Sequence, residues 1–373
     1  MLKFHPLRIT EVQPDAEDAV ALSLEVPPEL RPEYLGLPGQ HIVLRAELDG
    51  QEARRTYSLI NTPGEWPLRI VARVHERGCM SGHLAKEIKV GDEIDVLPPN
   101  GSLTPRLLDP AGTTAGTRRT YVGFAAGCGI TPVLSIAKAA LQASTGNRFI
   151  LFYGNSNTGR VMCLEELLGL KDRYLDRLAL HFVMSREPQE VELYNGRLDA
   201  MRVRELARTL FEPATVAEFF VCGPGDMIDQ VCGVLRELDV PAERIHGEHF
   251  TIAGDHFAEA QHTLPASEAA PPVKGPLAAN TAEVTVLMDG RRRTFTMRMD
   301  DEVVLDAAMR SGLELPFSCR AGVCSTCRTK VVSGRVEMDQ NFALEDWEVE
   351  QGYVLACQSR CKTPALELDY DEK

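Results

Sequence analysis

Hydrophobic residues in the first hundred positions come in short, strand-sized runs. Glycine, proline and asparagine separate these runs at the spacing expected of a small antiparallel β-barrel. One helical stretch, at about 81–88, interrupts the strands. The pattern predicts strands at 7–12, 20–26, 41–46, 54–60, 68–74 and 93–97.

The pattern then changes to a regular alternation of strands and helices. The buried type of strand recurs at 120–126, 149–153, 178–184 and 218–221. Helical periodicity lies between and after these strands, at 132–143, 164–171, 201–210 and 226–238. This alternation predicts a parallel sheet covered by helices on both faces.

A third region follows a segment rich in Ala, Pro, Glu and Ser. We interpret 255–281 as a semi-rigid tether because of this composition. After it the pattern predicts strands at 284–288 and 294–297 and a helix at 303–311. We therefore expect a barrel domain at 1–107, an α/β domain at 108–254, the tether at 255–281 and a last domain at 282–373.

Composition and charge restrict the function classes. The 373 residues are 44% hydrophobic and 25% charged, as in ordinary globular proteins. The net charge of −14 argues against nucleic-acid binding, which needs a basic surface. No apolar run is long enough for a membrane span. The N-terminus has no charged region leading into an apolar stretch, so we expect a cytoplasmic protein. In such a protein, ten cysteines indicate metal or redox use.

Four cysteines form the most specific motif of the chain. Cys319, Cys324 and Cys327 have the spacing C-x4-C-x2-C, and Cys357 follows downstream. This is the spacing of a plant-type 2Fe–2S cluster. Thiolates suit that cluster because they are soft, anionic ligands for iron. We therefore predict these four cysteines as the cluster ligands.

Two alternatives to this assignment need weighing. A structural zinc site usually pairs two C-x2-C motifs or adds histidines, and the histidines beyond residue 254 lie only in the tether. Cys361, four residues after Cys357, is a second candidate ligand, but we interpret it as a bystander thiol. Gly322 and Ser325 favour the cluster, because small residues let loop amides turn inward toward the sulfides.

A flavin site is indicated by two pieces of the barrel region. The first is the tetrapeptide Arg55, Thr56, Tyr57 and Ser58 at the end of a strand. An aromatic ring there can stack on the isoalloxazine, a hydroxyl can bond its N5 edge, and an arginine can hold a pyrophosphate. The alternative is that Tyr57 is simply part of the barrel core.

The second piece comes about 20 residues later. Gly78, Met80 and Ser81 lead into a predicted helix, where backbone amides and a serine hydroxyl make a phosphate cradle. Val71, on the strand before them, is also assigned to the cofactor. Each piece alone is weak, but the two in this order ahead of an α/β region predict FAD.

The α/β region opens with a glycine-rich turn between a strand and a helix. Gly127, Gly129, Thr131 and Pro132 lie at this junction, where a dinucleotide pyrophosphate can approach the helix N-terminus. The motif is not the G-x-G-x-x-G fingerprint, and a tight structural turn is the alternative.

A second turn of this kind strengthens the interpretation. Cys222, Gly223, Pro224 and Met227 again lie at a strand end and a helix start. Two such turns at the carboxyl edge of one sheet form a cleft in which a nicotinamide can lie over the flavin.

The form of the nicotinamide nucleotide is indicated by the residues after strand 178–184. Ser185 and Arg186 supply a hydroxyl and a planar bidentate cation, which suit a 2′-phosphate and hence NADPH. Ser156 and Arg160, after the preceding strand, are candidates for a second contact. The alternative is that Arg186 only caps a strand end, and that the neighbouring Glu187 weakens any phosphate site. NADH then remains possible.

The order of these motifs along the chain resembles the ferredoxin–NADP reductase superfamily with a C-terminal plant-type ferredoxin domain. More narrowly, the chain is similar to the reductase subunits of phenylacetyl-CoA epoxidases and related oxygenase reductases. That similarity rests on residues 4–7, 38–41, 248–250, 336–339 and 352–355.

The resemblance implies a multidomain fold and an electron relay. The fold is an antiparallel flavin-binding β-barrel, an α/β parallel-sheet nicotinamide domain and an α+β ferredoxin-like β-grasp domain. NAD(P)H reduces FAD, and the flavin passes electrons to the 2Fe–2S cluster. In this relay Tyr57, Ser58, Cys222 and Phe250 are the catalytic residues. Phe250 would border the isoalloxazine, with an ordinary packed aromatic as the alternative.

The electron acceptor would be a separate terminal oxygenase. We expect a diiron phenylacetyl-CoA epoxidase, with a Rieske-type or a steroid hydroxylase as alternatives, because the substrate chemistry belongs to the partner and leaves no residue here. A stand-alone diaphorase and a redox sensor are the alternatives from other classes.

Overall fold

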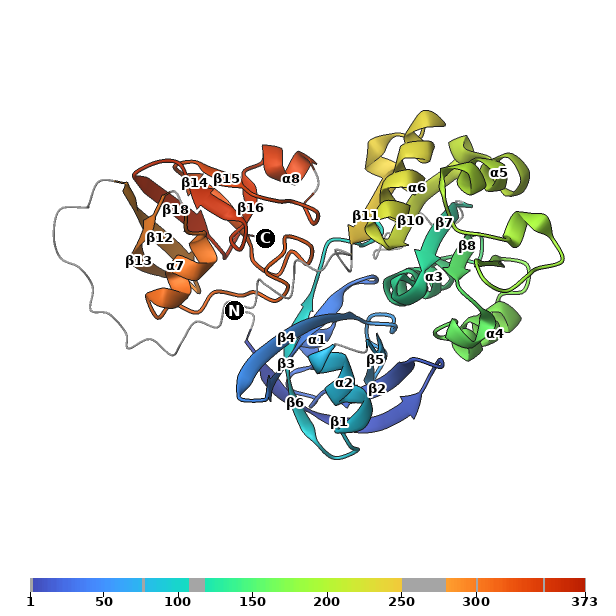
Figure 1. Ribbon diagram of the computed structural model, residues 1–373, viewed down its shortest axis with the longest axis horizontal. Coiled ribbons are helices and arrows are strands. Elements are labelled where there is room, and N and C mark those ends of the chain that lie inside the picture. The colour runs from blue at the N-terminus through green and yellow to red at the C-terminus, as the bar shows by residue number, and fades with distance from the viewer. Residues whose placement is uncertain are drawn as a thin grey trace. The chain divides into compact units, whose positions relative to one another are not determined.

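The computed structural model describes residues 3–75, 78–106, 118–249, 280–299, 301–344 and 346–372. Chain packing divides the protein into two compact units. The first unit is Phe4–Ile252, and the second joins Met1–Lys3 to Ala253–Lys373. Most of the predicted tether lies outside the described residues, as does Phe250. Each unit is described by itself below (Figure 1).

The N-terminal part of the first unit is a closed antiparallel sheet. Its elements are β1 (His5–Pro14), β2 (Ala19–Glu25), α1 (Arg31–Tyr34), β3 (His41–Leu48), β4 (Gln51–Ser58), β5 (Leu68–Arg73), α2 (Cys79–Lys86) and β6 (Glu93–Asn100). The strand order is β4-β3-β6-β1-β2-β5. An antiparallel bridge between Leu59 and Ile70 joins the two ends of this sheet. The predicted barrel is confirmed.

The rest of the first unit is a five-stranded parallel sheet in the order β11-β10-β7-β8-β9. Its strands are β7 (Thr120–Ala126), β8 (Arg148–Asn155), β9 (Leu178–Met184), β10 (Val216–Gly223) and β11 (Ile245–His249). Its helices are α3 (Ile130–Ala143), α4 (Leu164–Arg173), α5 (Ala200–Leu210) and α6 (Gly225–Glu237). Short 3-10 turns lie at η1 (Gly127–Gly129), η2 (Thr158–Arg160), η3 (Glu192–Tyr194), η4 (Pro213–Thr215) and η5 (Ala242–Arg244).

Successive residues of these strands face opposite sides of the sheet, as period-2 geometry requires. Tyr121 and Phe149 pack with α3 and α4, whereas Phe124 and Phe152 pack with α5 and α6. Both faces are therefore buried, and the predicted parallel sheet is confirmed.

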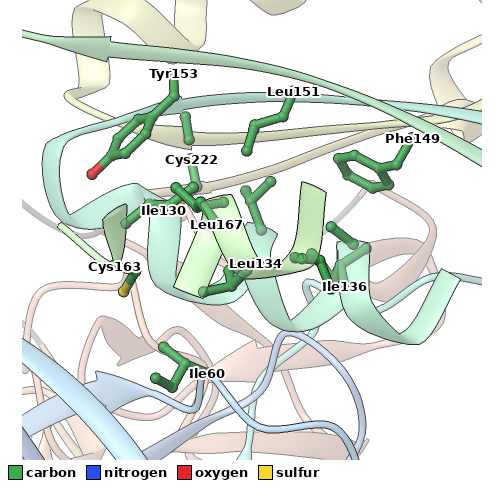
Figure 2. Close-up of a cluster of buried hydrophobic side chains, with 14 of the residues drawn as sticks. Ile60, Ile130, Leu134, Ile136, Phe149, Leu151, Tyr153, Cys163, Leu167 and Cys222 are labelled. Carbon is green, nitrogen blue, oxygen red and sulfur yellow. The ribbon is translucent and has the colours of Figure 1, made fainter. Parts of the chain in front are cut away.

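The barrel and the parallel sheet share one hydrophobic core. Ile60 of the barrel packs in the same cluster as Ile130 and Leu134 of α3 (Figure 2). Polar contacts reinforce this joint: Lys138 Nζ donates to the carbonyl of Ile60 at 2.8 Å and pairs with Glu166. These contacts fix the barrel against the parallel-sheet part within one unit.

The second unit is a five-stranded mixed sheet in the order β13-β12-β18-β14-β16, with a separate β15–β17 pair. Helix α7 packs on the face that carries Val284 and Val286. The elements are β12 (Thr281–Met288), β13 (Arg291–Arg298), α7 (Val304–Arg310), β14 (Arg328–Ser333), β15 (Val336–Met338), α8 (Asp346–Glu350), β16 (Tyr353–Leu355), β17 (Ser359–Cys361) and β18 (Ala365–Asp369). Thr281, the last residue of the predicted tether, belongs to β12, because its backbone pairs with Arg298 of β13.

Candidate cofactor sites

The two predicted flavin motifs meet in space. Arg55 Nη2 lies 4.0 Å from the Sγ of Cys79, the first residue of α2. The exposed Arg55 guanidinium therefore borders the helix start where a phosphate is expected. A methyl group built on Gly78 would lie 2.4 Å from Ser81 Oγ and would displace that hydroxyl from its present position. Ser81 Oγ accepts a hydrogen bond from the His75 amide at 3.2 Å, which holds the turn closed.

The remaining predicted flavin residues divide into two groups. Thr56, Tyr57 and Ser58 are consecutive on β4, and burial raises the pKa of the Tyr57 hydroxyl. By contrast, the side chains of Val71 and Met80 are almost fully buried in hydrophobic core clusters. Only the backbone of these two residues is available to a cofactor.

Three buried polar atoms without partners lie where the strand of the flavin motif approaches the strand of the second nicotinamide motif. Ser58 is paired with His41 across β3 and β4, and Cys222 is paired with Glu248 across β10 and β11. His41 Nδ1 lies 3.6 Å from Glu248 Oε1, so the two pairs are linked. Within the described residues, Ser58 Oγ, His41 Nε2 and Glu248 Oε2 have no hydrogen-bond partner.

Buried polar groups are normally satisfied, so these three atoms indicate that polar ligand atoms complete the site. They fit a flavin and a nicotinamide, whose rings carry both donors and acceptors. Motif spacing did not assign His41 or Glu248 to the site, because the two residues are about 200 positions apart and meet only in the folded chain.

The two nicotinamide motifs are packed directly against each other. β7 and β10 are neighbouring strands, and the turn after each lies at their common carboxyl edge. A methyl group on Gly129 would lie 2.1 Å from the backbone oxygen of Cys222. One on Gly223 would lie 3.2 Å from the amide nitrogen of Ala126. Gly129 is therefore required by the close approach of two backbones, whereas Gly223 lies at a tight but less restrictive contact.

The other predicted residues of these turns fix their shape. The Thr131 hydroxyl donates to the carbonyl of Cys128 at 3.0 Å. Pro132 is buried in the first turn of α3, and Pro224 is the N-cap of α6. Met227 is buried beneath that helix start. Burial raises the pKa of the Cys222 thiol well above its usual range, which keeps this side chain neutral.

Two further residues lie at the first turn and were missed by sequence reasoning. The buried Tyr153 hydroxyl donates to the carbonyl of Gly127 at 2.9 Å (Figure 2). Arg73, from the barrel, has its guanidinium beside Gly127, where an added methyl would lie 3.9 Å from Nη2. Arg73 donates to both carboxylate oxygens of Asp18, at 2.6 and 2.8 Å. Neither Tyr153 nor Arg73 belongs to a recognisable sequence motif, so only the fold reveals that they lie at this turn.

A pocket of ≈ 310 Å³ lies at the end of β9. It is lined by Met184, Ser185, Arg186, Glu187, Pro188, Asn195 and Gly196. The predicted pair Ser185 and Arg186 thus shares one pocket with Glu187. The suggested second contact from Arg160 stays a prediction; in the structure the Arg160 guanidinium is paired with Asp18. Ser156 Oγ is buried and has no partner within the described residues.

Three of the four predicted cluster cysteines lie in the loop between α7 and β14, and Cys357 lies in the turn between β16 and β17. Hydrogen bonds from the thiols of Cys324 and Cys357 hold the pKa of Cys319 well below its usual range. Contacts with Cys319 and Cys327 raise the pKa of Cys357. The four sulfur atoms are therefore near neighbours.

The backbone of the cysteine loop adopts an unusual shape. Arg320, Gly322 and Ser325 have φ values of 56°, 74° and 49°, and non-glycine residues rarely adopt this region. Gln358 Nε2 donates to the carbonyl of Arg320 at 2.9 Å and so holds the loop from outside. Such strain is typical of loops that wrap a ligand.

The alternative ligand Cys361 is engaged by another part of the domain. Its thiol donates to the carbonyl of Thr363 at 3.0 Å, and its side chain is fully buried in the core. Among the described residues, no three His, Cys, Asp or Glu side chains surround a single-ion position. A two-iron cluster divides its four ligands between two metal atoms, so its ligands need not surround one.

Comparison with known families covers the same three regions. An oxidoreductase FAD-binding domain matches residues 6–104 and an oxidoreductase NAD-binding domain matches 124–233. A 2Fe-2S iron-sulfur cluster binding domain matches 286–362. The chain is 35% identical to one of the subunits of 1,2-phenylacetyl-CoA epoxidase from Escherichia coli over 375 residues, 100% of this chain and 99% of the relative. The chain belongs to the ferredoxin reductase-type family of oxygenase reductases.

Other members of this family span the same length. The ferredoxin reductase component of 3-ketosteroid-9-alpha-monooxygenase from Rhodococcus rhodochrous is 31% identical, over 98% of this chain and 96% of its own. The solved structure of phthalate dioxygenase reductase shares the fold, with a TM-score of 0.55 and 22% identity over 98% of both chains.

This oxygenase reductase is therefore an NAD(P)H-dependent oxidoreductase that transfers electrons through FAD and a 2Fe–2S cluster. The predicted cofactors and the predicted reaction class are confirmed. No helix within the described ranges is long and apolar enough to cross a membrane.

Proposed function

We propose that this oxygenase reductase takes its electrons from NADPH and delivers them to a diiron oxygenase that acts on phenylacetyl-CoA. The observation that carries the proposal is the 35% identity to the Escherichia coli epoxidase component, which extends over the whole chain. It is supported by the Ser185–Arg186 pair in the pocket after β9, because a hydroxyl and a guanidinium together suit a 2′-phosphate.

The barrel residues would bind FAD as follows. Arg55 and the amides at the start of α2, around Ser81, hold the pyrophosphate. Tyr57 lies against the isoalloxazine ring, and the unpartnered Ser58 hydroxyl bonds its edge. When bound, FAD accepts a hydride from the nicotinamide and releases electrons singly.

The α/β residues would position NADPH. The turns at 127–132 and 222–227 bind the pyrophosphate and the nicotinamide, with Cys222 beside the ring. Tyr153 keeps the first turn in place through its hydrogen bond to Gly127, and the Arg73 guanidinium borders the turn from the barrel. Phe250, outside the described residues, would border the flavin. Ser185 and Arg186 bind the 2′-phosphate.

In the last domain, Cys319, Cys324, Cys327 and Cys357 would hold the 2Fe–2S cluster. We place the domain boundaries near 107, 254 and 281, with the segment before Thr281 as a tether. The partner oxygenase accepts the electrons, in the cytoplasm, and performs the chemistry on the substrate.

Reconstitution tests this proposal. The purified reductase is mixed with the oxygenase subunits of phenylacetyl-CoA epoxidase or with the oxygenase of 3-ketosteroid-9-alpha-monooxygenase, and product is measured with NADPH and NADH. We expect product with the epoxidase and NADPH. Product formed with the steroid oxygenase but not with the epoxidase would contradict the proposed identity of the partner. Rapid reduction of cytochrome c, with no product formed by either oxygenase, would favour a stand-alone diaphorase.

A further inference from the structure

The pocket after β9 holds two neighbouring side chains of opposite charge. Arg186 and Glu187 both line it. A carboxylate at this position favours the ribose hydroxyls of NADH, whereas an arginine favours the 2′-phosphate of NADPH. The nucleotide preference of the pocket therefore depends on which of the two charges a bound adenylate group meets.

The Glu187 carboxylate is already engaged by another segment of the protein. Its Oε2 accepts the backbone N–H of Thr158 at 2.7 Å, and its Oε1 accepts the Thr158 hydroxyl at 2.6 Å. Both oxygens are thus bound to the first residue of η2, in the loop after β8. The hydrogen bonds from Thr158 lower the pKa of Glu187, so the carboxylate is charged at neutral pH.

Other polar side chains of the pocket are also engaged within the protein. Asn195 Oδ1 accepts the Gln189 amide at 2.8 Å, and Asn195 Nδ2 donates to the Gln189 carbonyl at 3.0 Å. Ser185 Oγ makes only a long contact of 3.4 Å to the carbonyl of Asn155. Arg186 has no side-chain hydrogen bond or ion pair with the described residues. The pocket therefore presents one unpaired cation.

We propose that Glu187 is a specificity-determining positioning residue: Thr158 binds both of its carboxylate oxygens, which leaves Arg186 as the charge that a nucleotide 2′-phosphate meets. This inference rests on the proposed use of NADPH and names the side-chain contact that sets the preference for NADPH over NADH. The arrangement combines an attractive cation with restraint of a repulsive neighbour, and specificity commonly needs both.

Release of the carboxylate should change the preference in a predictable direction. A free Glu187 would repel a 2′-phosphate and would accept hydrogen bonds from the hydroxyls of an unphosphorylated ribose. For a carboxylate and a phosphate about 6 Å apart and fully exposed to bulk water, repulsion corresponds to an affinity loss of about three- to tenfold.

The test measures binding without electron transfer. Adenosine 2′,5′-bisphosphate and adenosine 5′-monophosphate are titrated into the oxidised, full-length holoprotein by calorimetry, and the ratio of their affinities is the readout. Glu187→Asp keeps the charge, but its side chain is too short to reach both Thr158 donors. Glu187→Gln removes the charge. Thr158→Val removes the hydroxyl donor, and the double variant Thr158→Val with Glu187→Gln removes this donor and the carboxylate charge together. Glu190→Asp, on an exposed neighbour, is the matched control.

We expect Glu187→Asp and Thr158→Val to lower the preference for the bisphosphate about three- to tenfold. Glu187→Gln and the double variant should keep or raise the wild-type preference, because no charge is left to repel the phosphate. An equal loss in all four variants would overturn the inference and assign Glu187 a purely structural role. Unchanged ratios in all four would overturn it as well. In both cases a wild-type preference for the bisphosphate would leave the NADPH proposal standing, whereas a wild type without that preference would contradict both.

Discussion

The cluster loop and the flavin–nicotinamide site are built in opposite ways. In the cluster loop, three of the four proposed ligands lie within nine consecutive residues, and the loop is shaped by its own backbone. The flavin–nicotinamide site is assembled from distant segments. His41 and Arg73 come from the barrel, whereas Tyr153 and Glu248 come from the parallel sheet. The first site depends on local conformation, and the second depends on how two domains pack.

This difference predicts different failure modes. A substitution in the cluster loop should remove one cofactor and leave the rest of the chain intact, because the loop belongs to a separate compact unit. A substitution in the first unit should affect nucleotide binding through backbone contacts between strands. The following predictions test that contrast, from the largest expected effect to the smallest.

Cys324→Ser should abolish the iron–sulfur absorption and stop electron delivery to an oxygenase, because a cluster ligand is lost. Flavin reduction by NADPH should persist at the wild-type rate. Visible spectroscopy and stopped-flow mixing measure both. Cys361→Ser is the matched control and should keep the cluster. Loss of the cluster in Cys361→Ser but not in Cys357→Ser would show that the ligand assignment is wrong.

Gly129→Ala should lower kcat/KM for NADPH by about 100-fold, because the added methyl forces two backbones apart and a displacement of about 1 Å can cost that much. Steady-state ferricyanide reduction measures it. Gly233→Ala, in α6 with no heavy atom within 4 Å of the new methyl, is the control. A Gly129→Ala variant with near wild-type kcat/KM would contradict the packed-turn account.

Arg55→Ala should weaken FAD binding by about 10- to 100-fold, since a charge-assisted hydrogen bond contributes about 1.5–3 kcal/mol. Flavin content after gel filtration and fluorescence titration measure the loss. Arg8→Ala, on an exposed face of β1, should keep its flavin. The assignment fails if acid extraction of the wild type releases FMN, which has no pyrophosphate.

Arg186→Ala should reduce the preference for NADPH over NADH by about tenfold, equivalent to about 1.4 kcal/mol. The kcat/KM values for both nucleotides measure it, and Arg208→Ala, on an exposed position of α5, is the control. A wild type that prefers NADH would contradict the assignment of the 2′-phosphate.

The sequence predicted regular elements well where burial is strong and local. Strands 120–126 and 178–184 agree with β7 and β9 at both ends. Helix α2 begins at Cys79, two residues before its predicted start. The prediction missed this boundary because the N-cap, Gly78, has no capping side chain to mark it. β11 was missed, since Ile-His-Gly-Glu-His is short and polar and becomes a strand only by pairing with β10.

The sites show the same division. The cysteine spacing selected four residues whose sulfur atoms are near neighbours in the structure, while their role as cluster ligands stays a prediction. The motifs of the first unit were predicted, but His41, Arg73 and Tyr153 were not assigned to the site. Each of these three acts through a partner far away in the chain, and no local pattern encodes such a contact. The engagement of Glu187 by Thr158 was likewise invisible to spacing.

The most direct test of the electron relay is anaerobic reduction of the holoprotein by NADPH. The flavin is followed by its absorption, and the cluster by electron paramagnetic resonance. The account predicts that NADPH reduces both the flavin and the cluster in the wild type, and only the flavin in Cys324→Ser. A wild-type cluster that stays oxidised after the flavin is reduced, yet is reduced by dithionite, would contradict it.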